Sequence, residues 1–297
     1  MRPLDRVIYK GPTAQVGSFT CAVNDPRFRD SGPTENHLVV FPRSGVWIRH
    51  AGSRAFVADP HIVTIYNRGQ EYARGSLSAE GDRCDWFAVT PEVALEIARE
   101  FASRSDDSPE RPFVREFVSC TSSLYLRQRR LYLRLRRRDI DALEAEESII
   151  GLVAQVIASA HGGRRWRRTP NVTREAHRDL VERARAQIVS QIARHDSVSS
   201  LAARLGSSPF HLCRVFRTAT GMTLHAYRLE LRLRMLLERL AEPHAQLSRI
   251  AMELGFSSHS HLTATLRHRA GVTPSALRRA LAQEPDANGT DVASIRA

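Results

Sequence analysis

The sequence is poor in cysteine, in lysine and in long apolar runs. Its four cysteines, Cys21, Cys84, Cys120 and Cys213, lie far apart and form no C-x-x-C pair. Neither a zinc knot, a thioredoxin-like motif nor a disulfide framework is therefore expected. No run of about 18 apolar residues occurs, which argues against a membrane span. The N-terminus lacks the apolar segment of a secretion signal, so we expect a cytoplasmic protein without membrane partners.

Nearly all of the positive charge comes from arginine, because Lys10 is the only lysine. The formal net charge of +12 and the pI near 10.6 favour an anionic partner. Between Asn171 and Leu281 there are 17 arginines against 8 acidic residues, a net charge of +9. Most of the excess charge therefore lies in the last third of the chain.

Short strands are predicted between Val16 and Thr90. Five segments there are rich in β-branched and aromatic residues and are separated by proline and glycine: His37–Phe41, Val46–His50, Arg54–Ala58, His61–Tyr66 and Cys84–Val89. Closely spaced strands of this kind predict a small antiparallel barrel or sandwich. Four aromatic residues either line a ligand pocket in it or belong to its core: Trp47, Tyr66, Tyr72 and Trp86. No effector-binding residue can be named from the sequence.

Helices are predicted after the strands. Thr90 is expected to cap a helix that has Pro91 in its first turn, and the polar segment Ser103–Pro112 predicts a loop. Two amphipathic helices joined near Arg138 then predict a helical hairpin. Their apolar faces are marked by Leu124, Leu131 and Leu135 in the first helix, and by Ile140, Leu143, Ile150, Val153 and Ile157 in the second. The hairpin packs on the barrel, forms a dimer interface, or does both.

The last third of the chain contains one segment twice. The first copy is LAARLGSSPFHLCRVFRTATGMT (Leu201–Thr223) and the second is IAMELGFSSHSHLTATLRHRAGVT (Ile250–Thr273). In each copy a glycine permits a tight turn and a serine is expected to cap the helix that follows. Two such units in tandem predict a double helix-turn-helix, which reads two grooves of DNA. The apolar helix between them, Leu224–Leu240, is predicted to be a rigid spacer.

The stretch GGRRWRRTPN, from Gly162 to Asn171, is typical of a linker. A helix capped by Thr173 is predicted to follow it, with apolar residues spaced four apart at Leu180, Ala184, Ile188 and Ile192. These patterns divide the chain into a barrel (1–112), a hairpin (113–163), a linker (164–172), a double helix-turn-helix domain (173–282) and a disordered tail (283–297).

Roughly Leu180–Arg279 resembles the DNA-binding domain of AraC/XylS-type transcriptional regulators. The matching segments are LAARLGSSPFHLCRVFR, TGMTLHAYRLELRLRMLLERL, IAMELGFSSHSHL and GVTPSALR, and the most distinctive residues are Gly255–Phe256 and the G-x-T-P at Gly271–Pro274. The N-terminal strands and the hairpin are similar, more weakly, to the cupin-like sensor and dimerisation region of that family. The resemblance implies an α+β chain, with an N-terminal cupin-like β-barrel and helical hairpin and a C-terminal all-α double helix-turn-helix domain.

The resemblance also implies a mechanism and its partners. The two units would bind adjacent major-groove segments of double-stranded promoter DNA. RNA polymerase, a small-molecule effector in the N-terminal domain and a second copy of the chain are the further partners expected. The effector, the target promoters and the direction of the effect on transcription stay open.

DNA-facing residues follow from the resemblance. They are Phe210, His211, Cys213, Arg214 and Arg217 in the first unit, and His259, Ser260, His261, Thr263 and Arg267 in the second. Arg214 is expected to bond a guanine bidentately, whereas Arg217 and Arg267 are expected to meet phosphates. Ala264 stands where the family often has a long polar side chain. The second unit is therefore expected to read bases less strictly, or to serve mainly as a scaffold.

Two other functions stay open: a cupin-type enzyme with a DNA-localising domain, and a non-specific architectural DNA binder. The sequence contains no G-x-S-x-G, no P-loop and no H-E-x-x-H motif, so we do not expect an enzyme. His37, His50 and His61 are lone residues, whereas a cupin metal site needs a close histidine pair with a carboxylate. Neither a metal nor a cofactor is therefore expected.

Overall fold

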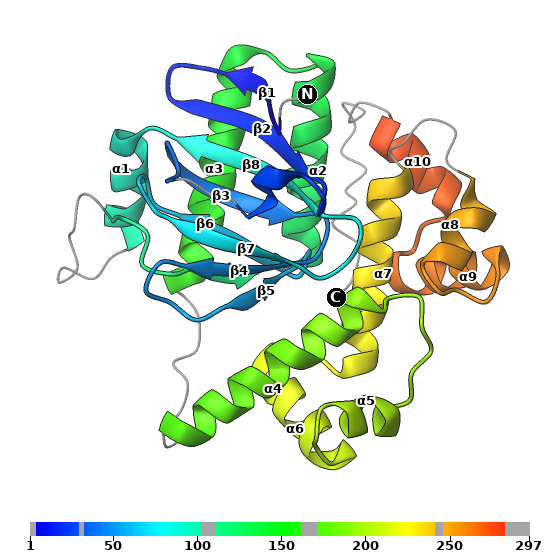
Figure 1. The fold of residues 1–297 in the computed structure, drawn as a ribbon. Helices are drawn as coiled ribbons and strands as arrows, with labels where there is room; N and C mark the ends of the chain where they lie inside the picture. Colours follow the sequence, from blue (N-terminus) through cyan, green and yellow to red (C-terminus); the bar gives the residue numbers. More distant parts are fainter. Residues whose placement is uncertain (1–3, 30–32, 102–110, 162–170, 241–245, 283–297) are drawn as a thin grey trace. The chain divides into compact units, whose positions relative to one another are not determined.

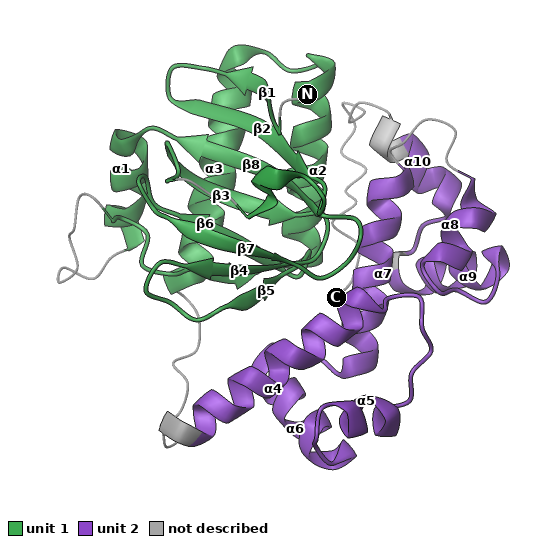
Figure 2. Ribbon diagram, in the orientation of Figure 1, with its two compact units in different colours: residues 1–166 green, residues 167–297 purple. Residues whose placement is uncertain are grey.

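The computed structural model describes residues 4–29, 33–101, 111–161, 171–240 and 246–282. The chain divides into two compact units, residues 1–166 and residues 167–297 (Figure 2). The described part of the first unit holds all the strands and three helices, and that of the second unit is helical (Figure 1). The linker residues 162–170, most of the predicted loop Ser103–Pro112 and the tail 283–297 lie outside the described residues.

Two antiparallel sheets form the framework of the first unit. The larger sheet has the strand order β1-β2-β8-β3-β6-β9, and the smaller has the order β5-β4-β7. The strands are β1 (Asp5–Lys10), β2 (Ala14–Cys21), β3 (His37–Pro42), β4 (Val46–His50), β5 (Phe56–Ala58), β6 (Ile62–Tyr66), β7 (Tyr72–Ser76), β8 (Asp82–Val89) and β9 (Phe117–Ser119). All five predicted strand segments are confirmed, as β3 to β6 and β8.

Side chains from both sheets form a common core. Phe56 of β5 and Ile48 of β4 lie in one buried cluster with Ile62 of β6, which belongs to the larger sheet. Each of these side chains is at most 6% exposed. Alternating inward residues on short strands thus bring the two sheets together, which is the arrangement that the strand pattern predicted.

The helices of the first unit are α1 (Pro91–Phe101), α2 (Ser122–Arg137) and α3 (Ala142–His161). Helix α3 packs against α1 and against four strands of the larger sheet, β2, β3, β8 and β9 (Figure 1). The predicted joint near Arg138 is confirmed, because Arg138 ends α2 in the left-handed conformation with φ 60°. Leu143 was predicted on the apolar face of α3, but it is 80% exposed, since the buried face starts at Ala145 and runs on through Ile149.

A buried carboxylate attaches α2 to the larger sheet. Asp85 of β8 is fully buried, and its Oδ2 accepts hydrogen bonds from Gln128 Nε2 at 3.0 Å and Arg129 Nη1 at 3.2 Å. Arg43 Nη1 lies 3.5 Å from the other carboxylate oxygen. Arg129 is itself 2% exposed, so the buried carboxylate has a buried positive partner.

Seven helices make up the described part of the second unit: α4 (Asn171–Ser190), α5 (Val198–Arg204), α6 (Pro209–Thr220), α7 (Leu224–Leu240), α8 (Leu247–Glu253), α9 (His259–Ala270) and α10 (Pro274–Ala282). The prediction that Thr173 caps α4 is wrong, because α4 already includes Asn171 and Thr173 lies within its first turn. The predicted inner face of α4 is buried at Leu180, Ala184 and Ile188. Within the described residues, no helix has the length and apolar character of a membrane span.

Candidate nucleic-acid interface

The first repeat folds as two helices joined by a glycine turn. Helix α5 is capped by Ser197, and Gly206 follows it with φ +64°, a conformation that side chains disfavour. Ser208 then caps α6, since its Oγ accepts from the backbone nitrogen of His211 at 3.2 Å, and Pro209 takes the first helical position. The local sequence thus places the start of α6 as predicted.

Helix α6 has one buried and one exposed face. Leu212, Val215 and Phe216 are at most 3% exposed, and the Phe216 ring meets Tyr227 of α7 edge-on at 5.2 Å between ring centres. Phe210 is 78% exposed, although it is aromatic. The other exposed members of the predicted DNA-facing set are Cys213, Arg214 and Arg217. The 3.6-residue period therefore separates a packing face from a face free for a partner.

His211 lies between Arg214 and α4. Its Nδ1 is 3.4 Å from Arg214 Nη2, and its ring centre is 5.3 Å from that of His177 on α4. His211 is half-buried, whereas Arg214 is exposed. His211 thus contacts Arg214 on one side and His177 on the other, a placement that the sequence did not show because His177 lies 34 positions away.

The second repeat has the same architecture. Gly255 turns the chain after α8 with φ +76°, and Ser258 caps α9 by accepting from the backbone nitrogen of His261 at 3.0 Å. The inward residues Leu262 and Leu266 are at most 2% exposed. Gly271 ends α9 in the left-handed conformation, as Gly221 ends α6.

The outer face of α9 differs from that of α6. His259, Ser260 and Arg267 are exposed, as predicted, together with the small Ala264. Thr263 departs from the prediction: it is half-buried, and its hydroxyl oxygen is shielded from solvent without a hydrogen-bond partner among the described residues. On the helix surface, position 263 lies between the buried Leu262 and Leu266 and the exposed residues, so it borders the buried face.

His261 is exposed but already engaged by its own turn. Its Nδ1 lies 2.9 Å from Ser257 Oγ, and its ring meets Phe256 edge-on at 5.7 Å. His261 therefore stabilises the turn between α8 and α9. This contact was not expected from the sequence, which placed His261 among the DNA-facing residues.

An arginine of the spacer helix joins the second repeat to the segment after α4. Arg232 of α7 is 7% exposed, and its guanidinium donates to the carbonyl oxygen of Ile192 from Nε at 2.9 Å and from Nη2 at 2.7 Å. The same guanidinium lies 5.9 Å from the centre of the Phe256 ring. Burial lowers the pKa of Arg232 to about 10, and neighbouring Arg228 adds to the effect. Arg232 stays charged at neutral pH and fastens the second turn to the segment after α4.

A second buried arginine fixes α4 against α7. Arg185 of α4 is 4% exposed and donates from Nε to Tyr227 Oη at 2.8 Å. Glu182 lies one turn earlier on α4 and accepts from Arg185 Nη1 at 3.1 Å. These contacts hold α7 in one position, as a spacer between two reading helices requires.

The two second helices, α6 and α9, carry positive but no negative side chains. Neither PFHLCRVFRTAT nor HSHLTATLRHRA contains aspartate or glutamate. Their exposed arginines and histidines, the helix N-termini and the capping serines all suit phosphate and base edges. No group of three metal-ligating side chains occurs in the part of the chain that the structure describes.

One family model agrees with this geometry. Residues 201–280 match a family model for a helix-turn-helix domain. A solved AraC-type transcriptional regulator from Chromobacterium violaceum is 28% identical over 38% of this chain and 99% of its own, with a TM-score of 0.34. Fatty-acid-bound ToxT from Vibrio cholerae is 12% identical over 91% of this chain and 96% of its own, with a TM-score of 0.36.

A DNA-binding transcriptional dual regulator from Escherichia coli K-12 is 23% identical over 35% of this chain and 94% of its own, with a TM-score of 0.33. No curated protein matches the chain. The match to the family model covers both turns and both of the helices, α6 and α9, whose outer faces are free. The chain therefore carries a helix-turn-helix domain, a DNA-binding module, over residues 201–280.

Proposed function

We propose that this chain is a sequence-specific, DNA-binding transcription regulator of the AraC type, and that α6 does most of the base reading while α9 contributes mainly affinity. The observation that carries the proposal is the contrast between the two outer faces. Helix α6 presents Phe210 and Arg214 to solvent, whereas α9 presents Ala264 at the position equivalent to Arg214. An alanine offers a base edge no hydrogen bond.

Arg214 is the residue to which we assign base recognition. It lies in the second turn of α6 on the exposed face, and the second helix of a helix-turn-helix enters the major groove with its N-terminal half. An arginine there bonds the O6 and N7 of guanine, which is worth about 1–3 kcal/mol of discrimination. Phe210 and Cys213 flank Arg214 on that face, and His211 orients it through the 3.4 Å contact.

Arg217 and Arg267 are assigned to phosphates. They occupy equivalent positions, late in α6 and in α9, and both are exposed. In α9, His259 and Ser260 remain free for DNA, whereas His261 is engaged with Ser257. We therefore assign His261 and Thr263 minor parts in base reading.

The remaining assignments follow from the role of a regulator. We infer that residues 173–282 act as the DNA-binding part on promoter DNA in the cytoplasm, with RNA polymerase as partner and without catalysis. The first unit would act as a sensor for a small-molecule effector and as the contact between two copies. The hollow at one end of its smaller sheet supports the sensor role.

A selection from random double-stranded DNA tests the proposal. The wild-type protein should enrich one motif of about 20 base pairs, with a guanine in the part protected by α6. Arg214→Ala should lose the preference at that guanine. The matched change Arg267→Ala should weaken binding while the motif stays the same. Enrichment of no motif by the wild-type protein, or an unchanged motif for Arg214→Ala, would refute it.

A further inference from the structure

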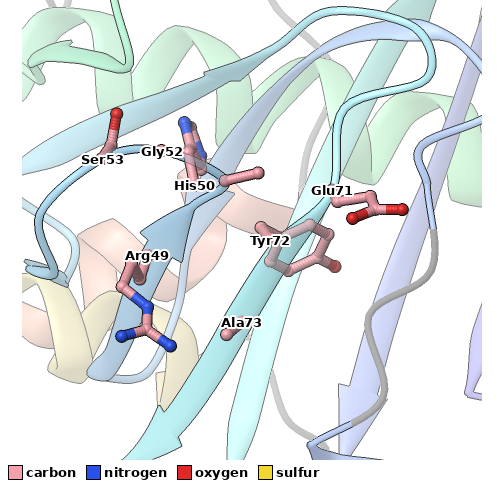
Figure 3. Close-up of a pocket in the computed structure, with 8 residues that line it drawn as sticks. Arg49, His50, Gly52, Ser53, Glu71, Tyr72 and Ala73 are labelled. Carbon is pink, nitrogen blue, oxygen red and sulfur yellow. The ribbon is translucent and has the colours of Figure 1, made fainter.

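A pocket of about 410 Å³ opens at one end of the smaller sheet, within the first unit (Figure 3). Its walls are the end of β4, the turn Ala51–Ser53 that follows it, and the start of β7. The backbone nitrogen of Ala51 donates to the carbonyl oxygen of Glu71 at 3.0 Å and holds two of these walls together. The pocket is therefore built by backbone pairing and does not depend on a mobile side chain.

Two opposite charges flank the pocket. Arg49 and Glu71 are both exposed, and Figure 3 shows their charged groups on different sides of the Tyr72 ring. Among the residues that the structure describes, neither side chain makes a hydrogen bond or an ion pair. A cation and an anion that face one hollow without pairing with each other are available to a ligand.

The floor of the pocket is rigid. Tyr72 Oη accepts a hydrogen bond from Arg74 Nη2 at 3.1 Å, and the Tyr72 ring centre lies 5.0 Å from that of Tyr66. His50 is 1% exposed and is held between Tyr66 and Phe56, at 4.7 Å and 5.6 Å between ring centres.

The two ring nitrogens of buried His50 are polar atoms without a hydrogen-bond partner among the described residues. The nearest carboxylate oxygen, Glu116 Oε1, is 3.8 Å away. Buried polar groups are normally hydrogen-bonded, so such a pair of nitrogens marks a site where a polar partner fits. Burial lowers the pKa of His50 and so favours the neutral ring. Glu116 has the opposite, smaller effect.

Of the four aromatic residues considered from the sequence, Tyr72 lines this pocket. Trp47 instead packs on Gly75, where an added Cβ would lie 3.1 Å from Trp47 Cβ. Trp86 donates from Nε1 to Asp5 Oδ1 at 2.8 Å. The pocket is thus not an aromatic box, and its character comes from Arg49 and Glu71.

We propose that this pocket binds a small dipolar molecule of the amino-acid class. Its carboxylate pairs with Arg49, its ammonium group pairs with Glu71, and its carbon skeleton lies along the end of the sheet between them. An anion alone would bring its charge toward Glu71, and a cation alone would bring its charge toward Arg49. The inference rests on the proposed sensor role, because it names the class of effector that the first unit takes.

Binding of ω-amino acids to the full-length protein tests the proposal, because these ligands vary the distance between the two charges. Calorimetry and thermal unfolding would be recorded with glycine, β-alanine, 4-aminobutanoate and 6-aminohexanoate, and with hexanoate and hexylamine as single-charge analogues. We expect at least one dipolar ligand to bind, and both analogues to bind at least about tenfold more weakly.

Variants of the two charged residues complete the test. Arg49→Gln and Glu71→Gln should each weaken the best dipolar ligand at least about tenfold. Arg6→Gln and Glu35→Gln, at exposed charges outside the pocket, should leave its affinity unchanged. Circular dichroism would check that each variant folds. The proposal is overturned if no dipolar ligand binds, if the analogues bind equally well, or if the two pocket variants bind like wild type.

Measurements of DNA affinity with and without the ligand test the ligand class and the sensor role separately. If a dipolar ligand binds in the pocket and changes the affinity for the selected DNA motif, both the ligand class and the sensor role are supported. If it binds without any effect on DNA affinity, the site stands and the sensor role fails. If nothing binds while the motif still depends on Arg214, the ligand class fails and the DNA-reading proposal stands.

Discussion

Arg232 occupies the space into which any side chain at Gly255 would project. A Cβ on Gly255 would lie 2.7 Å from Arg232 Nη2 and 2.4 Å from the carbonyl oxygen of Ala193. The turn of the second helix-turn-helix is therefore packed directly against the segment that follows α4. This contact ties the second reading helix to the part of the domain that supports the first.

We predict that Gly255→Ala lowers the free energy of unfolding of residues 167–297 by about 3 kcal/mol or more. The left-handed conformation alone costs a side chain about 1–2 kcal/mol, and the contacts with Ala193 and Arg232 add to that cost. Gly206→Ala is the matched control, because Gly206 has φ +64° and open space around its Cβ position. Urea unfolding followed by circular dichroism measures both, and equal losses would show that the Arg232 contact is unimportant.

The turns were predictable from sequence, whereas the contact that holds them was not. Gly206, Ser208, Gly255 and Ser258 act locally, and the sequence placed each of them correctly. An arginine on an amphipathic helix is expected in solvent. Arg232 is buried because the carbonyl oxygens of Ile192 and Arg194, 40 and 38 positions away, accept its hydrogen bonds. Local patterns carry no information about such partners.

The strands were also only partly predictable from local sequence patterns. The five strands with aromatic and β-branched runs were predicted, but β1, β2, β7 and β9 were not. Strand β1 lies at the edge of its sheet with mostly exposed residues, β7 contains Arg74 and Gly75, and β9 has three residues. These strands form because a neighbouring strand pairs with them, and their own composition does not require it.

The exposed face of α6 was predictable because its helical period is regular, but the finer roles were not. His261 turns back to Ser257, and Thr263 borders the buried face. Both outcomes depend on side-chain direction within one turn, which the spacing of residue types leaves undetermined.

The carboxylate of Asp85 gives a test of the first unit. Asp85→Ala should lower the free energy of unfolding by about 3–5 kcal/mol, because Arg129 is left with its charge buried and its carboxylate removed. Glu144→Ala, which breaks the half-buried pair with Arg134, should cost less, about 1 kcal/mol. Trp47 and Trp86 lie in the first unit and residues 171–282 contain no tryptophan, so tryptophan fluorescence reports mainly on this unit. Similar losses for the two variants would contradict the prediction.

Asp82 should make the first unit less stable as the pH rises. Burial raises the pKa of Asp82 to about 6, although Arg74 Nε lies 2.8 Å from its Oδ2. The folded state then holds this proton to a higher pH than the unfolded state does, so the free energy of unfolding falls as the pH increases from about 4 to about 6. At about 1.4 kcal/mol per pH unit, the loss is roughly 3 kcal/mol.

Asp82→Asn should remove that loss, so the stability of the variant relative to wild type should increase between pH 4 and pH 7. Asp25→Asn is the control: hydrogen bonds from Arg27 lower the pKa of Asp25 to about 2, so this carboxyl titrates below that range. Unfolding would be followed by fluorescence at each pH. A difference between Asp82→Asn and wild type that does not change with pH would refute the assignment.

Arg217 and Arg267 should act on affinity without acting on sequence preference. If each meets one phosphate, Arg217→Gln and Arg267→Gln each remove one released counterion, and the slope of log K against log salt should become shallower by about 0.9. Arg99→Gln, at an exposed arginine of α1 in the first unit, should leave the slope unchanged. Fluorescence anisotropy on the selected site and on an unrelated duplex would measure this. Because phosphates are common to both duplexes, the two variants should weaken binding to each by the same factor. A loss confined to the selected site would show instead that the arginine reads a base.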